Sequence, residues 1–297
     1  MSIYLKEGDT IALVAPAAKL PEGIVNRAVS LFQSWGLKVL TGKYVETDSV
    51  YFAATDEERA ADIQYFINHS EVKAIICLRG GYGSIRTLEY LNFSGFITNP
   101  KLLVGFSDVT VFHALLNCHL GIESIHATMP VNFPDHGENQ STDSLKQALF
   151  GELKGYNITP HKLNIQGSAT GKLIGGNLAV LQSIASTFCD INTENSILFI
   201  EDVGEYAYSV DRMLMNLAYS GKLSQLSGII AGSFTQIKDE DKFGKTVYEI
   251  IHSHVHNLGI PIAFGMQAGH TEPNLALYLG RKVQLNVKNQ SVELVFG

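Results

Sequence analysis

Ser107 stands where a buried strand is expected to turn directly into a helix. Residues 101–105 (KLLVG) form the apolar run of a short strand, and the chain from Val109 onward (VTVFHALLNCHL) has the spacing of an amphipathic helix. Only Phe106, Ser107 and Asp108 join the two, so the serine hydroxyl is held clear of the backbone, over the positive end of a helix dipole. Hydrolases present a serine nucleophile in this way.

A serine hydroxyl is a weak nucleophile at neutral pH, and it needs a base that is itself oriented by a carboxylate. His270 lies in a glycine-rich loop (GMQAGHTEP) after the apolar run PIAF, and Glu201 follows the apolar run SILFI. Asp202 and Glu205 are alternatives to Glu201 for the orienting acid. The order Ser, Glu, His is that of α/β-hydrolases, but Val109 replaces the second glycine of their G-x-S-x-G signature, which indicates a different scaffold.

A glycine-rich turn, RGGYG at residues 79–83, follows a second apolar strand (VKAIICL). Glycine adopts positive φ easily, so backbone N–H groups of this turn can point inward. We expect the N–H of Gly81, with that of Asp108, to form an oxyanion hole, and Gly80 is the alternative donor. The turn is not a dinucleotide-binding loop, because Arg86 stands where the third glycine would be.

Strands alternate with helices along the first half of the chain, which predicts an α/β fold with a parallel sheet covered by helices on both faces. The expected strands are 10–16, 38–40, 72–78 and 101–105, and the expected helices are 22–35, 56–68, 84–91 and the segment after Ser107. Asp56 is the expected N-cap of the second helix. Ligands of such sheets bind at the carboxyl ends of strands, where RGGYG and GFSD both lie.

Polar, turn-rich residues from about Phe133 to Gly171 interrupt the alternation and indicate a boundary between domains. We expect a nucleophile domain at 1–135, a linker region at 136–170 and a C-terminal domain at 171–297 that carries the glutamate and the histidine. Its expected elements are helices at 177–188, 209–219 (N-cap Ser209) and 246–258, and strands at 196–200, 228–233, 260–264, 277–280, 283–287 and 292–296.

The composition limits the class of protein. A formal net charge of −7 over 297 residues argues against nucleic acid or an anionic membrane as a partner. No apolar run approaches the ~18 residues of a membrane span. The three cysteines are few and far apart, which suits reduced thiols and a cytoplasmic protein. Cys77 and Cys118 are expected in the core rather than as nucleophiles.

No cofactor and no metal are expected. Three histidines lie close together at 252, 254 and 256 and could suggest a metal site. His252 and His256 share one helix face, but His254 points away from it, so the three cannot bind one metal ion together.

The sequence resembles the LD-carboxypeptidases, serine peptidases of peptidoglycan recycling that have microcin-immunity peptidases as relatives. The segments KLLVGFSDVT, CLRGGYG, ILFIEDVGEYAYSVDRML and FGMQAGH carry this resemblance, which spans about the whole chain. It implies an N-terminal flavodoxin-like domain, similar to class I glutaminases, with a second, mixed β/α C-terminal domain. It also implies an active site at the domain junction and a homodimer.

The resemblance implies Ser107 as nucleophile, His270 as general base and Glu201 as the charge-relay acid. The implied reaction removes the terminal D-Ala from a murein tetrapeptide, at the bond after meso-diaminopimelate or lysine. Arg79 and Tyr82 are candidates for binding this substrate, and Arg86 is a further cationic candidate.

Two other functions stay open. One is a related peptidase or amidase that cleaves peptidyl-nucleotides, which an aromatic base-stacking residue near the site would favour. The single tryptophan, Trp35, belongs to an early helix and argues against it. The other is a muropeptide-binding module without catalysis.

Overall fold

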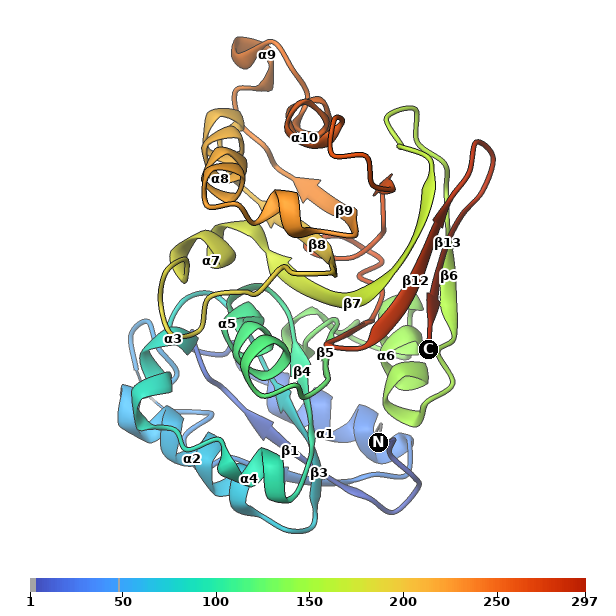
Figure 1. Ribbon diagram of the computed structural model, residues 1–297. Helices are drawn as coiled ribbons and strands as arrows, with labels where there is room; N and C mark the ends of the chain where they lie inside the picture. The colour runs from blue at the N-terminus through green and yellow to red at the C-terminus, as the bar shows by residue number, and fades with distance from the viewer. Residues whose placement is uncertain (1–3, 48) are drawn as a thin grey trace.

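The computed structural model describes residues 4–47 and 49–297, which form two sheets (Figure 1). The first half of the chain supplies five strands of a six-stranded sheet, whose order is β11-β5-β4-β3-β1-β2. Its strands are β1 (Thr10–Val14), β2 (Lys38–Thr41), β3 (Val72–Cys77), β4 (Leu102–Gly105), β5 (Ser124–His126) and β11 (Leu277–Leu279). The five strands from β1 to β5 are parallel in the order 2-1-3-4-5, which is the flavodoxin-like order. The predicted fold of this half is confirmed.

Short helices connect these parallel strands. They are α1 (Ile24–Ser34), α2 (Asp56–Asn68), α3 (Ser84–Thr87), α4 (Ser94–Thr98) and α5 (Thr110–Ala114), which continues as a π-helical turn at Leu115–His119. The predicted N-cap Asp56 is wrong, because Thr55 caps α2. Its hydroxyl accepts the Glu58 N–H while the Glu58 carboxylate accepts the Thr55 N–H, a capping box.

The second half of the chain forms a seven-stranded mixed sheet in the order β10-β9-β8-β7-β12-β13-β6. Its strands are β6 (Gly155–Ile158), β7 (Gly167–Asn177), β8 (Ser196–Val203), β9 (Gly228–Thr235), β10 (Ile262–Phe264), β12 (Lys282–Val287) and β13 (Val292–Phe296). Strands β7 to β10 are parallel, and β12, β13 and β6 extend the sheet with antiparallel partners. This is the mixed second domain that the sequence predicted.

The helices of this half are α7 (Leu178–Ser183), α8 (Ala207–Tyr219), α9 (Glu240–Phe243) and α10 (Val247–Val255). Ser209 therefore lies inside α8 and is not its N-cap. Helix α7 is shorter than expected and begins after Asn177, whose side-chain oxygen accepts the Val180 N–H. The segment 136–170 contains a helix, α6 (Gln140–Phe150), and strand β6.

The two halves pack into one another (Figure 1). Strand β11 comes from the C-terminal half but pairs antiparallel with β5 of the first sheet. One apolar cluster includes Ile76 and Val104 of the first sheet together with Phe199 and Ile230 of the second. Because buried strands of both sheets share this core, residues from the two halves are held in fixed relation where the sheets meet.

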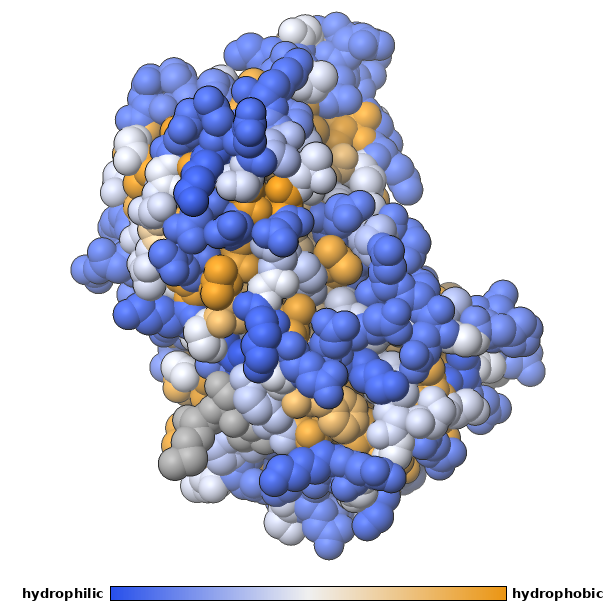
Figure 2. All heavy atoms as spheres, turned by 90° about the vertical axis from the view of Figure 1, so that its right-hand side faces the viewer, coloured by the Kyte–Doolittle hydropathy of each residue, from blue (hydrophilic) through white to orange (hydrophobic). Residues whose placement is uncertain are grey.

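The surface away from this junction is mostly polar. On the face shown in Figure 2, hydrophilic side chains predominate and apolar residues gather only in small separate patches. Among the described residues, no helix combines the length and the apolar character that crossing a membrane requires.

Candidate active site

Ser107 begins a single 3-10 turn (Ser107–Val109) directly after β4, and its φ is +62°. This left-handed conformation costs a non-glycine residue about 1–3 kcal/mol, so the surrounding packing must enforce it. At Gly105, a Cβ atom would lie 2.9–3.1 Å from the Val109 side chain. The first glycine of the motif thus admits the valine that replaces the second one, and the sharp turn is retained.

Ser107, His270 and Glu201 form a continuous chain of hydrogen bonds. The His270 Nε2 atom lies 3.1 Å from Ser107 Oγ, and His270 Nδ1 lies 2.8 Å from Glu201 Oε2. A carboxylate only accepts hydrogen bonds, so Nδ1 carries the proton and Nε2 is free to accept from the serine hydroxyl. The sequence predicted these three residues as partners, and the structure brings them together from both halves of the chain.

Glu201 is fully buried at the carboxyl end of β8, whereas 23% of the His270 side chain is exposed. The backbone N–H of His270 also donates to Glu201 Oε2, at 3.2 Å. This close approach depends on Gly269, whose φ is +115° and where a Cβ atom would lie 2.5 Å from that oxygen. The loop can therefore wrap around the carboxylate only because a glycine precedes the histidine.

Further side chains fix the histidine loop. Thr235 Oγ1, at the end of β9, donates to the His270 carbonyl at 2.9 Å. The Asn274 side-chain oxygen accepts the Gly269 N–H at 2.9 Å, and the Asn274 N–H donates to Ser141 Oγ of α6 at 2.8 Å. The sequence did not predict these residues, because the hydrogen bonds that they form join distant segments and have no local motif.

The two alternative acids do not contact His270 in the described part of the chain. Asp202 is buried, and its carboxylate accepts from Asn177 Nδ2 and the Ala179 N–H, each at 2.9 Å. Burial raises the Asp202 pKa to about 6. Asp202 therefore fastens β8 to the start of α7, while Glu205 lies half-buried on the loop beyond the strand.

The RGGYG turn lies directly against the serine. At Gly80, a Cβ atom would lie 3.2 Å from Ser107 Cβ and 3.3 Å from Oγ. The Gly80 carbonyl accepts the Ala18 N–H at 3.2 Å, so the Gly81 N–H of the same planar peptide points the opposite way. The Asp108 carboxylate accepts the Ser84 N–H at 2.8 Å, and burial raises its pKa. Asp108 thereby joins the serine turn to the turn that follows β3.

The cationic candidates differ in their surroundings. Arg79 is half-buried, and its guanidinium donates to the Lys19 carbonyl. Arg86 is exposed and forms an ion pair with Asp56. Arg79 thus has no carboxylate partner among the described residues, whereas Arg86 is already paired.

The remaining candidate groups have structural surroundings. Burial raises the pKa values of the Cys77 and Cys118 thiols, which disfavours the reactive thiolate. His254 pairs with Asp211 at 2.7 Å, while the rings of His252 and His256 stack with centroids 5.3 Å apart. The described residues contain no group of three or more His, Cys, Asp and Glu side chains that is arranged to hold a metal ion.

Two family models match this chain. Residues 11–127 match the LD-carboxypeptidase N-terminal domain, and residues 170–285 match the LD-carboxypeptidase C-terminal domain. The chain belongs to the LD-carboxypeptidase family. It is therefore related to hydrolases that cleave at the carboxyl end of peptides.

Individual relatives of this LD-carboxypeptidase cover nearly all of its length. The probable murein peptide carboxypeptidase of Bacillus subtilis is 30% identical, over 99% of this chain and 93% of the relative. The crystal structure of muramoyltetrapeptide carboxypeptidase from Oxalobacter formigenes has a TM-score of 0.88 at 30% identity, with 97% and 98% of the two chains covered. The microcin C7 self-immunity protein of Escherichia coli is 26% identical over 98% of this chain and 93% of the relative.

Proposed function

We propose that this LD-carboxypeptidase is a serine peptidase that removes the terminal D-Ala from murein tetrapeptides in cell-wall recycling. The observation that carries the proposal is the unbroken chain from Ser107 Oγ through the His270 ring to the buried Glu201 carboxylate. The similarity to murein peptide and muramoyltetrapeptide carboxypeptidases supports the choice of substrate.

The reaction begins when Ser107 Oγ attacks the carbonyl carbon before the terminal D-residue and its proton passes to His270 Nε2. The Glu201 carboxylate accepts a hydrogen bond from the Nδ1–H group of His270 and stabilises the imidazolium that forms. His270 then gives the proton to the leaving amine as the C–N bond breaks, so that D-Ala departs and the peptide stays esterified to Ser107. A water molecule attacks the ester with His270 again as base, which releases the shortened peptide and restores the serine.

The developing oxyanion is expected to bind the N–H groups of Gly81 and Asp108. The turned Gly80–Gly81 peptide and the position of Asp108 at the start of a helical turn support this assignment. One donor of this kind contributes about 2.7–4 kcal/mol to the transition state in other hydrolases. Gly80, where a Cβ atom would lie 3.3 Å from Ser107 Oγ, is the alternative donor.

We assign the terminal carboxylate of the substrate to Arg79. Its guanidinium is half-buried beside the RGGYG turn and has no ion-pair partner among the described side chains. An arginine without a carboxylate partner can bind the free carboxylate that distinguishes a carboxypeptidase substrate from an internal peptide bond. Tyr82, on the same turn, is the second candidate for contact with the substrate.

We also propose a homodimer in the cytoplasm. The three cysteines are unpaired, which suits a reducing compartment. Sedimentation analysis at micromolar concentration tests the dimer.

The substrate assignment is tested by following release of the terminal alanine from a murein tetrapeptide that ends in D-Ala and from the same peptide that ends in L-Ala. We expect release from the D-form alone. Equal release from both forms, or none from either by folded protein, would contradict the proposal.

A second candidate is the cleavage of peptidyl-nucleotides. Trp35 is the only tryptophan of the chain, and it is buried beside α1, so it cannot stack on a nucleobase of such a substrate. However, Tyr82 in the RGGYG turn and Tyr51 are both exposed, and either ring could stack on a base. A peptidyl-adenylate offered in competition with the tetrapeptide decides between the two candidates.

A further inference from the structure

Arg59 is the largest fully buried side chain among the described residues, and the proposed reaction gives it no part. It lies on α2, and its guanidinium donates to three backbone carbonyl groups. These are the carbonyl of Pro16 after β1, that of Ala54 before α2 at 3.2 Å, and that of Gly83 after β3 at 2.9 Å. One side chain therefore joins three loops at the carboxyl edge of the first sheet.

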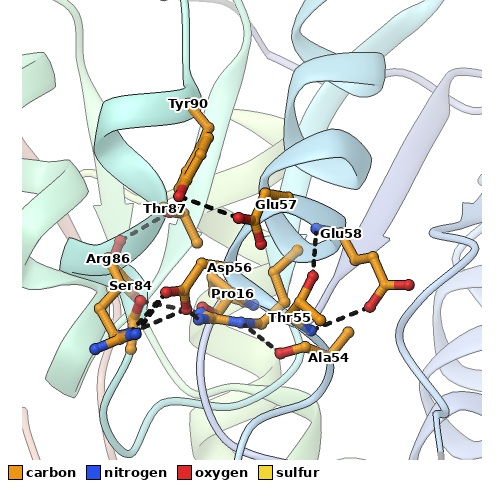
Figure 3. A network of polar contacts seen from close by, with 12 residues as sticks. Pro16, Ala54, Thr55, Asp56, Glu57, Glu58, Ser84, Arg86, Thr87 and Tyr90 are labelled. Atoms are coloured by element: carbon orange, nitrogen blue, oxygen red, sulfur yellow. Dashed lines mark hydrogen bonds and ion pairs between the residues drawn. The ribbon is translucent and has the colours of Figure 1, made fainter.

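Asp56 balances the charge of this buried guanidinium. Its carboxylate forms an ion pair with Arg59 and a second one, 2.7 Å long, with Arg86. Figure 3 shows Pro16, Ala54 and Asp56 close together at the start of α2, with Arg86 of α3 facing Asp56. Replacing a buried ion pair by apolar side chains is often neutral for stability, so the stability of the fold does not by itself account for this arginine.

The Gly83–Ser84 peptide lies between opposite charges. Its carbonyl accepts a hydrogen bond from Arg59 Nη1, and its N–H donates to the Asp108 carboxylate at 2.8 Å. A trans peptide is planar and directs these two groups in opposite directions, so the two contacts fix its orientation. Asp108 directly follows the nucleophile, and its own N–H is one of the proposed oxyanion donors. Arg59 thus holds the peptide to which the side chain of that donor residue is bonded.

The other proposed donor, the Gly81 N–H, is oriented from the opposite end of the RGGYG turn. The Ala18 N–H donates to the Gly80 carbonyl at 3.2 Å and thereby turns the Gly80–Gly81 peptide. Ala18 lies two residues after Pro16, whose carbonyl Arg59 holds. The packing is tight, because a Cβ atom at Gly81 would lie 2.8 Å from Ala18 Cβ. A shift of the segment at Pro16 therefore reaches the Gly81 N–H.

Resting on the proposed function, we propose that Arg59 is the positioning residue of the oxyanion hole. Its guanidinium is buried, so it acts through the backbone of the loops that hold both donors, the N–H groups of Gly81 and Asp108. These donors bind an oxygen that becomes negative only in the transition state, so their placement acts on kcat rather than on KM. A displacement of about 1 Å in such a site costs about 10²-fold in rate.

The test compares Arg59→Met with Lys101→Met, which is a matched control. Lys101 is 1% exposed, and its Nζ donates to the carbonyls of His69 and Val72 at 2.7 Å and 3.0 Å. It is thus also a buried cation bonded to backbone carbonyl groups, but it precedes β4, at the edge of the sheet opposite to Ser107. Both variants should lose stability in urea unfolding. Only Arg59→Met should lower kcat for D-Ala release, by about 100-fold with KM within about threefold of the wild type.

Arg59→Lys gives a second measurement, which also serves if Arg59→Met does not fold. The carbonyls of Pro16 and Gly83 share one guanidinium nitrogen, Nη1, so a lysine ammonium replaces it in part. The hydrogen bond to the Ala54 carbonyl is lost, and kcat should lie about tenfold below that of the wild type with KM unchanged. A wild-type kcat in Arg59→Lys would overturn the proposal.

A fluorophosphonate probe separates this inference from the choice of substrate. Ser107 Oγ forms a bond to phosphorus as fluoride leaves, the serine proton passes to His270, and the phosphoryl oxygen is expected in the oxyanion hole. The rate of labelling should fall in Arg59→Met about as much as kcat does, and it should stay near the wild-type rate in Lys101→Met. Slow labelling of Arg59→Met supports the inference even if the wild type releases no D-Ala.

Equal labelling rates in the wild type and in Arg59→Met would overturn the inference, whatever the substrate is. An equal loss of kcat in the two methionine variants, or a rise of KM with kcat unchanged, would overturn it too. A wild type that the probe does not label would overturn the proposed serine mechanism and the inference with it.

Discussion

Adding a methyl group at Gly269 is expected to separate the base from its orienting acid. In Gly269→Ala, the new Cβ would lie 2.5 Å from Glu201 Oε2 and 2.7 Å from Glu201 Cβ. Ordinary contact requires about 3.4 Å or more, so the carboxylate must retreat by almost 1 Å. The hydrogen bond from His270 Nδ1, now 2.8 Å, then exceeds the range of a useful bond.

The magnitude follows from this displacement. A misplacement of about 1 Å in catalytic geometry costs about 10²-fold in rate. The alanine must also adopt a φ of +115°, a strain of about 1–3 kcal/mol that lowers the stability of the fold. We therefore expect kcat for D-Ala release to fall about 100-fold. The free energy of unfolding should fall by about 1–3 kcal/mol, the cost of the strained backbone.

Gly265 offers a matched control in the same loop. Its φ is +84°, but no atom lies within 4 Å of a Cβ atom placed there. Gly265→Ala should lose similar stability in urea unfolding and keep a kcat close to that of the wild type. If kcat of Gly269→Ala lies within threefold of kcat of Gly265→Ala, contact with Glu201 does not control the rate and the reasoning is refuted.

Three further predictions concern the surroundings of the site. Thr235→Val removes the hydrogen bond to the His270 carbonyl, and a neutral hydrogen bond contributes about 1 kcal/mol. In steady-state assays kcat should fall about three- to tenfold with KM unchanged, and an unchanged kcat would contradict this. Gly80→Ala places a Cβ atom 3.3 Å from Ser107 Oγ and should lower kcat about tenfold while the melting temperature stays near that of the wild type, so a large loss of stability alone would refute it. Burial lowers the pKa of His113 to about 4, whereas its value in the unfolded chain is 6.5. The neutral imidazole therefore contributes its full share to the free energy of unfolding above pH 6.5, and this contribution is lost as the pH falls through 4. The loss amounts to about 3 kcal/mol. Urea unfolding between pH 7 and pH 4 should show this decline in the wild type and a shallower one in His113→Phe, and equal slopes would contradict the assignment.

The candidate site residues could be predicted in part because functional side chains of α/β proteins lie at the carboxyl ends of strands. Ser107 and Glu201 directly follow apolar runs, so each is expected at the carboxyl end of a strand, where ligands of such sheets bind. The two strands belong to different sheets, so only the family resemblance implied that these residues meet, and the role of each stays a prediction. The sequence also contains the signal for the true cap of α2, since Thr55 and Glu58 have the spacing of a capping box.

Other features could not be predicted from the sequence. Strand β11 has three residues, and nothing in LYL indicates that it joins the sheet of the other half. Thr235 and Asn274 support the histidine loop through contacts that only the folded chain creates. The positive φ of Ser107 likewise has no local signal, because the surrounding packing imposes it and no second glycine accompanies it.

The central claim is that Ser107 is the nucleophile that His270 activates. The most direct measurement is kcat for D-Ala release from murein tetrapeptide by the wild type and by Ser107→Ala, with folding of both checked by circular dichroism. Loss of a nucleophile of this kind removes about 10⁶-fold in a serine protease, so the variant should show no release above background. Release by Ser107→Ala at the wild-type rate would contradict the account.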